Sequence, residues 1–212
     1  MARKKVLTSI ITGDIINSRG SKVRQWLPVL KKVLALSGKS PQAWEIYRGD
    51  SFQLEVKNPA DALLTAMRIK AYVKTIKNVD VRLAIGIGEK DFSPSRITES
   101  NGEAFVYSGE KLESLKQEKQ NMAVKSRWPV FDREMNLYIR FALIAMDNWS
   151  TGAADLIKLV VDNPDITQTK LAAKLKITQS AVSGRQKRAY YTEVKELEIL
   201  FREKVEQLIR TT

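Results

Sequence analysis

The sequence of 212 residues contains neither cysteine nor histidine. The absence of cysteine excludes disulfides and thiolate metal sites, and the absence of histidine removes the commonest general base and metal ligand. A metal ion bound by this chain must therefore be held by carboxylate and carbonyl oxygens. Such ligands suit magnesium, manganese or calcium rather than zinc.

Long hydrophobic runs are also missing. The most apolar stretch is interrupted by Arg140 and Asp147, whereas a membrane span needs about 18 to 20 continuous apolar residues. The N-terminal segment Met1 to Lys5 carries three basic residues, but no apolar segment with a small-residue cleavage site follows it. We therefore expect no signal peptide, no membrane partner and a cytoplasmic location.

Acidic residues are outnumbered by basic ones, 24 against 36, which gives a formal charge of +12. This charge favours a polyanionic partner such as nucleic acid or an anionic membrane surface. A basic soluble enzyme is the alternative that charge alone leaves open. Hydrophobic residues make up 43% of the chain, which is enough to bury one or two cores.

The spacing of apolar residues predicts an α+β fold for the first 130 residues. We expect strands at 5–16 and 79–88, a hairpin at 44–56 with Gly49 and Asp50 at its tip, helices at 24–36, 58–76 and 104–115, and a polar segment at 116–125. This order favours helices packed on one face of a mainly antiparallel sheet. The prediction is a ferredoxin-like, palm-type domain over residues 1–130.

The remaining residues predict a connecting helix within 131–150 and an all-α helix-turn-helix domain over 151–212. A set of apolar residues is spaced so that two short helices of this domain pack against each other, and Ala172 is small enough to allow these helices to cross closely. The set consists of Leu171, Leu175, Ile177 and Val182. Lys176 lies in the turn between these two helices, at a position where a glycine is common. The turn must therefore place a non-glycine residue in the left-handed conformation or adopt a different backbone geometry.

The second of these short helices has an outward face suited to duplex DNA. Thr178 is its candidate N-cap, and no acidic residue lies between Asp165 and Glu193. Glutamine, serine and lysine side chains can contact base edges or phosphates in the major groove. The predicted DNA-binding residues are Thr178, Gln179, Ser180, Ser183, Arg185, Lys187 and Arg188. A three-helix domain that binds protein, with these residues as a solvated face, is the alternative.

Apolar residues recur every three to four positions on the charged C-terminal helix. They are Val194, Leu197, Phe201, Val205 and Leu208. This pattern is typical of a dimer seam, which would make the protein a homodimer. It is equally typical of a helix that packs on its own domain.

Two aspartates in the N-terminal part are candidate metal ligands. Asp14 lies near the end of the first predicted strand and Asp50 at the hairpin tip. The two carboxylates would converge if that strand lies beside the hairpin, and paired carboxylates hold divalent cations bound to nucleotide phosphates. Both residues are also common in turns, where they cap backbone N–H groups.

Four segments, in this order, resemble the successive motifs of class III nucleotide cyclase domains. They are GDIINS at 13–18, RGDSF at 48–52, RLAIGIG at 82–88 and GEAFVYSGEKLE at 102–113. The resemblance implies that Asp14 and Asp50 bind Mg²⁺ or Mn²⁺ and that Asn17 and Ser18 cradle a triphosphate; Arg48 is a further candidate nucleotide contact.

The sequence departs from the cyclase pattern where that family carries a transition-state asparagine and, four residues later, an arginine. Tyr107 and Lys111 stand there. Lysine can replace the charge of arginine but not its planar fork. Lys111 is thus the one candidate catalytic residue, and it lacks the planar fork that the cyclase pattern supplies at this position.

Over nearly its whole length the chain resembles the SatD-like family of small bacterial proteins, in which such a domain precedes a tryptophan and a helix-turn-helix. Trp149-Ser150-Thr151 and the run TQTKLAAKLKITQSAVS at 167–183 carry this likeness. Our first hypothesis is a DNA-binding transcriptional regulator whose palm-like domain binds a nucleotide or serves for assembly. The alternative is a divalent-metal-dependent nucleotide-processing enzyme that its helix-turn-helix regulates or targets.

Overall fold

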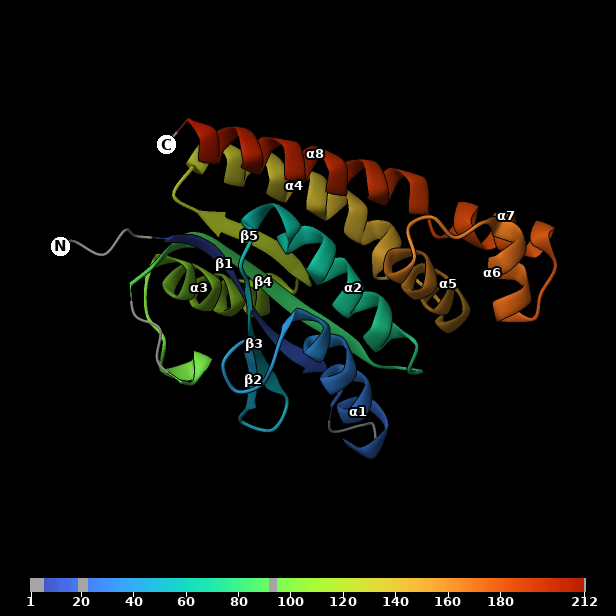
Figure 1. The fold of residues 1–212 in the computed structure, drawn as a ribbon, viewed down its shortest axis with the longest axis horizontal. Coiled ribbons are helices and arrows are strands. Elements are labelled where there is room, and N and C mark those ends of the chain that lie inside the picture. Colours follow the sequence, from blue (N-terminus) through green and yellow to red (C-terminus); the bar gives the residue numbers. More distant parts are fainter. Residues whose placement is uncertain (1–5, 19–22, 92–94, 212) are drawn as a thin grey trace.

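The computed structural model describes residues 6–18, 23–91 and 95–211, and it has a mixed α+β fold (Figure 1). Its sheet has five strands in the order β2-β3-β1-β4-β5. The strands are β1 (Val6–Ile16), β2 (Trp44–Tyr47), β3 (Ser51–Val56), β4 (Asp80–Lys90) and β5 (Met122–Ser126). The prediction of the α+β class is confirmed; Lys5, the predicted start of the first strand, lies outside the described residues.

The central strand β1 pairs antiparallel with β3 on one side and with β4 on the other. Alternate residues of β1 point to opposite faces of the sheet, because the side chains of a strand repeat every two residues. Ile11 belongs to the main hydrophobic core, whereas Ile10 packs with Ala104 and Phe105 in a separate cluster. Both faces of the sheet are therefore buried.

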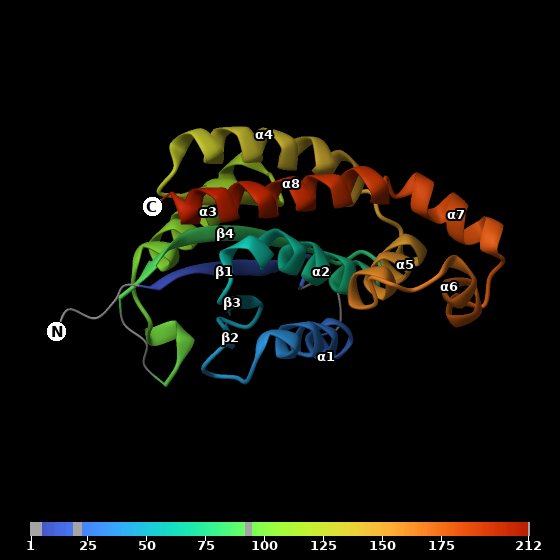
Figure 2. The ribbon, with the colours of Figure 1, turned by 45° about the horizontal axis from the view of Figure 1, so that its top comes forward.

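Helices cover both faces, which corrects the expectation of helices on one face. The helices α1 (Val23–Leu34) and α2 (Ala62–Lys74) contribute to the main core, and α3 (Glu103–Glu118) lies on the opposite face. Figure 2 shows α3 apart from α1 and α2. The sequence hides this arrangement because the helical spacing of apolar residues says nothing of which face of a sheet a helix covers.

Strand β5 was not predicted, since residues 116–125 were expected to be polar and without a strand. It pairs parallel with β4, with Leu83 opposite Met122 and Ile87 opposite Ser126. The strand is five residues long, and α3 forms the crossover that parallel neighbours require. Pairing with a strand distant in the sequence, rather than a local pattern, makes this segment extended.

The C-terminal half consists of α4 (Pro129–Met146), α5 (Thr151–Asp162), α6 (Gln168–Leu175), α7 (Gln179–Arg188) and α8 (Tyr191–Arg210). Helix α8 runs back along α4, so that the C-terminus lies far from α6 and α7 (Figures 1 and 2). The Phe131 and Phe201 ring centroids are 5.5 Å apart, and Lys204 pairs with Glu134 at 2.9 Å. Within the described residues, no helix is both long and apolar enough to cross a membrane.

Packing on its own chain accounts for much of the apolar pattern of α8. Val194, Phe201 and Val205 are buried and belong to the main core. The same core includes residues of α1, α2, α4 and α5. The predicted boundaries at residues 130 and 150 stay a prediction, but no gap in the buried core marks them.

Candidate functional site

Helices α6 and α7 form the end of the molecule farthest from the C-terminus (Figure 1). Leu171 of α6 and Val182 of α7 are buried between these helices and α5, and Ala172 is buried beside them. Leu175 and Ile177 are partly buried against the same core. The apolar set expected from the sequence therefore does join the two short helices.

The connection between α6 and α7 is short because each helix end is capped within a few residues. Lys176 adopts the left-handed conformation with φ 52° and ψ 44°, the first of the two geometries expected for a turn without glycine. The N–H of Ile177 donates to the carbonyl of Ala172 at 3.0 Å. Thr178 caps α7, as predicted, by accepting a hydrogen bond from the N–H of Ala181 at 3.2 Å.

The outward face of α7 carries side chains that can donate and accept hydrogen bonds. Gln179, Ser180, Ser183, Lys187 and Arg188 are all exposed. Gln179 contacts Gln168 of α6 at 3.4 Å, and the hydroxyls of Thr178 and Ser180 are 3.0 Å apart. These contacts are with exposed groups, so solvent or a partner can replace them at little cost.

Arg185 differs from the other predicted DNA-binding residues because it turns toward α5. Its guanidinium donates to the carbonyl of Gly152 at 3.4 Å, and its side chain is half-buried. This contact ties α7 to the first turn of α5. We assign Arg185 a positioning role within the three-helix unit.

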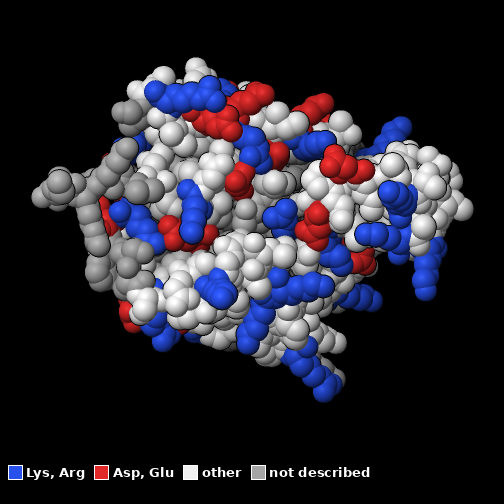
Figure 3. Space-filling view, viewed as in Figure 1, with Lys and Arg blue, Asp and Glu red and all other residues white. Residues whose placement is uncertain are grey.

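Positive charge surrounds the α6–α7 end. Lys170, Lys174, Lys176, Lys187 and Arg188 are exposed there, and the stretch between Asp165 and Glu193 contains no acidic residue. Figure 3 shows basic side chains projecting from this end of the molecule. The local field therefore suits a phosphate surface.

One buried and two partly exposed polar contacts attach this unit to the rest of the protein. The indole N–H of Trp149 donates to the carbonyl of Ala189, directly after α7, at 2.9 Å. Asp162 at the end of α5 accepts a hydrogen bond from the Tyr72 hydroxyl at 2.5 Å and pairs with Arg68 at 3.2 Å. Burial, then the hydrogen bond to Asp162, raises the pKa of Tyr72 to about 12. Sequence reasoning missed Arg68 and Tyr72, which lie 90 or more residues before their partner.

The two candidate metal ligands lie close together, as expected for a first strand beside the hairpin. Asp14 is opposite Ser51 in the β1–β3 register, and Asp50 directly precedes Ser51. Ser18 donates its hydroxyl hydrogen bond to the Asp50 carboxylate at 2.5 Å. The hairpin tip thus closes over the end of β1.

Two cations already neutralise the Asp14 carboxylate. Arg82 contacts both carboxylate oxygens, at 3.0 and 3.2 Å, and Lys116 lies 3.8 Å away. Burial nevertheless raises the pKa of Asp14, and the negative charge of Asp50 adds to this, while Arg82 and Lys116 lower it. Arg82 is opposite Asp14 in the β1–β4 register, a signal that becomes visible only when the strand pairing is known.

The cluster does not fit a resident divalent cation as it stands. The described residues contain no group of three acidic, histidine or cysteine side chains placed to hold a metal ion. A cation bound to Asp14 would have to compete with the guanidinium of Arg82, which contacts both oxygens of that carboxylate, and one oxygen of Asp50 already accepts a hydrogen bond from Ser18. The expectation of Mg²⁺ or Mn²⁺ therefore supports no catalytic step here.

The other residues named by the cyclase resemblance are spread around this cluster. Asn17 has a left-handed backbone (φ 62°), and its side-chain amide donates to the carbonyl of Asn78 at 3.3 Å. Arg48 is exposed in the turn between β2 and β3 (φ 51°). On α3, Lys111 is 3.3 Å from Ser114, and the ring of Tyr107 faces Lys125.

Lys111 lies apart from the carboxylates. Its positive charge lowers the pKa of Asp132 in the first turn of α4, although burial raises that pKa overall. The residue of α3 that approaches Asp14 is Lys116. The geometry therefore gives Lys111 no role at the Asp14–Asp50 cluster.

Replacing Asp14 with asparagine is expected to reduce the stability that the protein loses between pH 3.5 and pH 7, relative to the parent chain. The pKa of Asp14 is raised above its ordinary value of 3.8. The folded protein therefore favours the protonated carboxyl group of Asp14. The stability that this group contributes is fully present below pH 3.8 and is lost as the pH rises through the raised pKa. Urea unfolding between pH 3.5 and 7 measures this, with the exposed Asp165→Asn as control. The prediction is wrong if the variant loses as much stability as the parent chain between these two pH values.

The chain matches no protein-family model, and no curated protein is similar enough to it to count as a match.

Proposed function

We propose that the protein is a DNA-binding transcriptional regulator whose α6–α7 pair is a helix-turn-helix with α7 as its recognition helix. One observation carries the proposal: α7 is capped at Thr178 and presents an exposed, polar and basic face at the free end of the molecule. Helix-turn-helix proteins place such a helix in the major groove. The three-helix protein-binding domain, by contrast, gives no reason for the lack of acidic residues between Asp165 and Glu193.

The side chains of α7 divide into two roles under this proposal. Gln179, Ser180 and Ser183 lie in its first half, where recognition helices contact base edges, and an amide can pair bidentately with adenine. Lys187 and Arg188 lie at its end and contact phosphates. A transcriptional regulator must share a compartment with the DNA that it binds, and this agrees with the expected cytoplasmic location.

For the first 130 residues we propose a ferredoxin-like, palm-type domain of the SatD-like kind with a sensory or assembly role. The element order β1-α1-β2-β3-α2-β4, with β1 antiparallel to both β3 and β4, supports this assignment. Its candidate nucleotide contacts are Asn17, Ser18 and Arg48. The alternative, a metal-dependent nucleotide-processing enzyme, has less support because Arg82 and Lys116 pair with Asp14 and Lys111 lies elsewhere.

Removal of two phosphate contacts is expected to weaken DNA binding and flatten its dependence on salt. Each lost contact changes the slope of log K against log[salt] by about 0.9, so Lys187→Ala/Arg188→Ala should flatten it by about 1.8 and lower affinity roughly thirty-fold near 0.15 M salt. Fluorescence anisotropy with a labelled duplex pool, measured from low to physiological salt, gives both quantities.

The matched control is Lys31→Ala/Lys32→Ala, which removes two adjacent exposed charges from α1. It lowers the net charge equally but should leave affinity and slope near the parent values. If the parent chain binds no duplex even at low salt, or if the two double variants weaken binding equally, the proposed recognition helix is wrong.

A further inference from the structure

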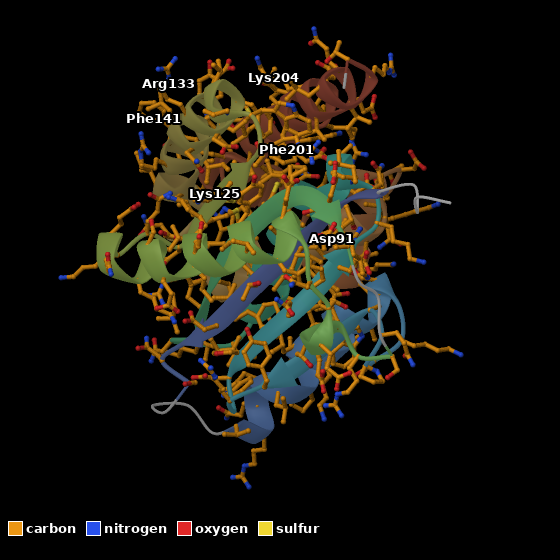
Figure 4. All side chains as sticks on the ribbon, turned by 90° about the vertical axis from the view of Figure 1, so that its left-hand side faces the viewer. Asp91, Lys125, Arg133, Phe141, Phe201 and Lys204 are labelled. Carbon is orange, nitrogen blue, oxygen red and sulfur yellow. The ribbon has the colours of Figure 1, made fainter. Side chains whose placement is uncertain are left out.

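Large apolar side chains gather on the solvent side of α4. Val130, Phe141 and Ile144 are 69%, 63% and 69% exposed, and Leu137 is also exposed. Val130, Leu137 and Ile144 recur every seven residues, so they form one stripe along the helix. Figure 4 shows Phe141 and Arg133 on the outer side of α4, whereas Phe201 lies on the inner side of α8. An exposed apolar stripe of this kind marks an interaction surface.

A groove of about 600 Å³ runs between α4 and α8 beside this stripe. Its walls include Phe141 and Ile144 of α4 and Leu197 and Leu200 of α8, and Tyr190 closes one end. Tyr190 is the residue between α7 and α8. The groove therefore begins where the proposed recognition helix ends.

The charges at the edges of this surface are complementary between the two helices. Arg133 and Arg140 of α4 are exposed and seven residues apart, as are Glu196 and Glu203 of α8. None of these four side chains forms an ion pair with any described residue. Basic groups therefore flank the stripe on α4, and acidic groups of the same spacing lie on α8.

Helices α4 and α8 pack antiparallel, and this packing determines which of these charged residues lie at the same height along the helix axes. Glu134 pairs with Lys204, and the Phe131 and Phe201 rings are in contact. Counting along both helices from these contacts places Arg133 near the level of Glu203, and Arg140 near the level of Glu196. A two-fold axis parallel to the helices would preserve those levels and bring α4 of one chain against α8 of the other.

We propose that a second copy of this chain docks here, with α4 against the partner's α8 around a two-fold axis parallel to both helices. The apolar stripes are then covered, and each arginine faces a glutamate of the other copy. Both α6–α7 units lie at the same end of the dimer. This consequence rests on the proposed DNA-binding function, because it predicts a target with two symmetric half-sites, as dimeric helix-turn-helix proteins bind.

Sedimentation of the full chain at micromolar concentration tests the surface directly. The parent should sediment at twice the 24.0 kDa chain mass. Arg133→Glu/Arg140→Glu and Glu196→Arg/Glu203→Arg should each raise the dimer dissociation constant at least about tenfold, because like charges then meet across the interface. Mixing the two variants should restore dimers, since the heterodimer pairs opposite charges at every position.

The control is Leu36→Glu, a charge placed on an equally exposed apolar residue remote from α4 and α8; it should leave the dimer intact. A monomeric parent chain, or a mixture of variants that stays monomeric while circular dichroism shows both folded, overturns the proposed interface. A monomer that still binds duplex DNA overturns the interface alone, and a dimer that binds no duplex overturns the proposed function alone.

Discussion

Replacement of Trp149 by alanine is expected to lower the free energy of unfolding by about 3–5 kcal/mol, the usual cost of truncating a large buried aromatic residue. Trp149 is 4% exposed and lies between the end of α4 and the start of α5. Its indole N–H also holds the carbonyl of Ala189 at 2.9 Å. The substitution therefore leaves a cavity and releases the segment that follows α7.

Urea unfolding followed by far-ultraviolet circular dichroism measures this loss. Trp149→Phe separates the two causes, because it keeps most of the buried ring but leaves the Ala189 carbonyl without its donor, at a cost of about 1–3 kcal/mol. The exposed Leu36→Ala is the control for a lost apolar side chain. A loss below about 1 kcal/mol for Trp149→Ala, the ordinary scale of a single substitution, would show that the tryptophan does not anchor the C-terminal helices.

Replacement of Lys70 by methionine in the parent chain is expected to lower the free energy of unfolding by about 3–5 kcal/mol, because it leaves two partly buried carboxylates without their fully buried partner. Lys70 is fully buried, and its ammonium group pairs with Asp80 at 2.8 Å and with Asp147 at 2.7 Å. Asp80 begins β4 and Asp147 follows α4. One side chain of α2 thus joins the sheet to the helix that leads toward the recognition unit.

The control for Lys70 is Lys77→Met, which removes an exposed charge just beyond the end of α2. It should change the urea midpoint little, as surface substitutions usually do. The variant Lys70→Met/Asp147→Asn removes one of the stranded charges and should recover part of the loss. If Lys70→Met is as stable as the parent chain, the prediction is wrong. Lys74, which also contacts Asp80, would then be sufficient to neutralise that carboxylate.

The features that could be predicted from the sequence are those set by neighbouring residues. Thr178 caps α7 because a threonine side chain reaches the N–H three residues on, and this needs no distant contact. Lys176 adopts a left-handed turn because the apolar spacing on both sides leaves room for only a short connection. The proximity of Asp14 and Asp50 was also predictable, since it needed only the correct assumption that the first strand lies beside the hairpin.

The tertiary structure decided what depends on pairing between distant segments. Strand β5 exists because β4 offers it a partner, and Arg82 reaches Asp14 because those two strands are in register. The same holds for α8: its apolar spacing fits a dimer seam and an internal helix equally well, and only its path along α4 shows which side chains are buried. Sequence by itself determined the local elements and their caps, because short-range sterics and hydrogen bonds specify them. The three-dimensional packing determined which charges are neutralised and which apolar faces remain open.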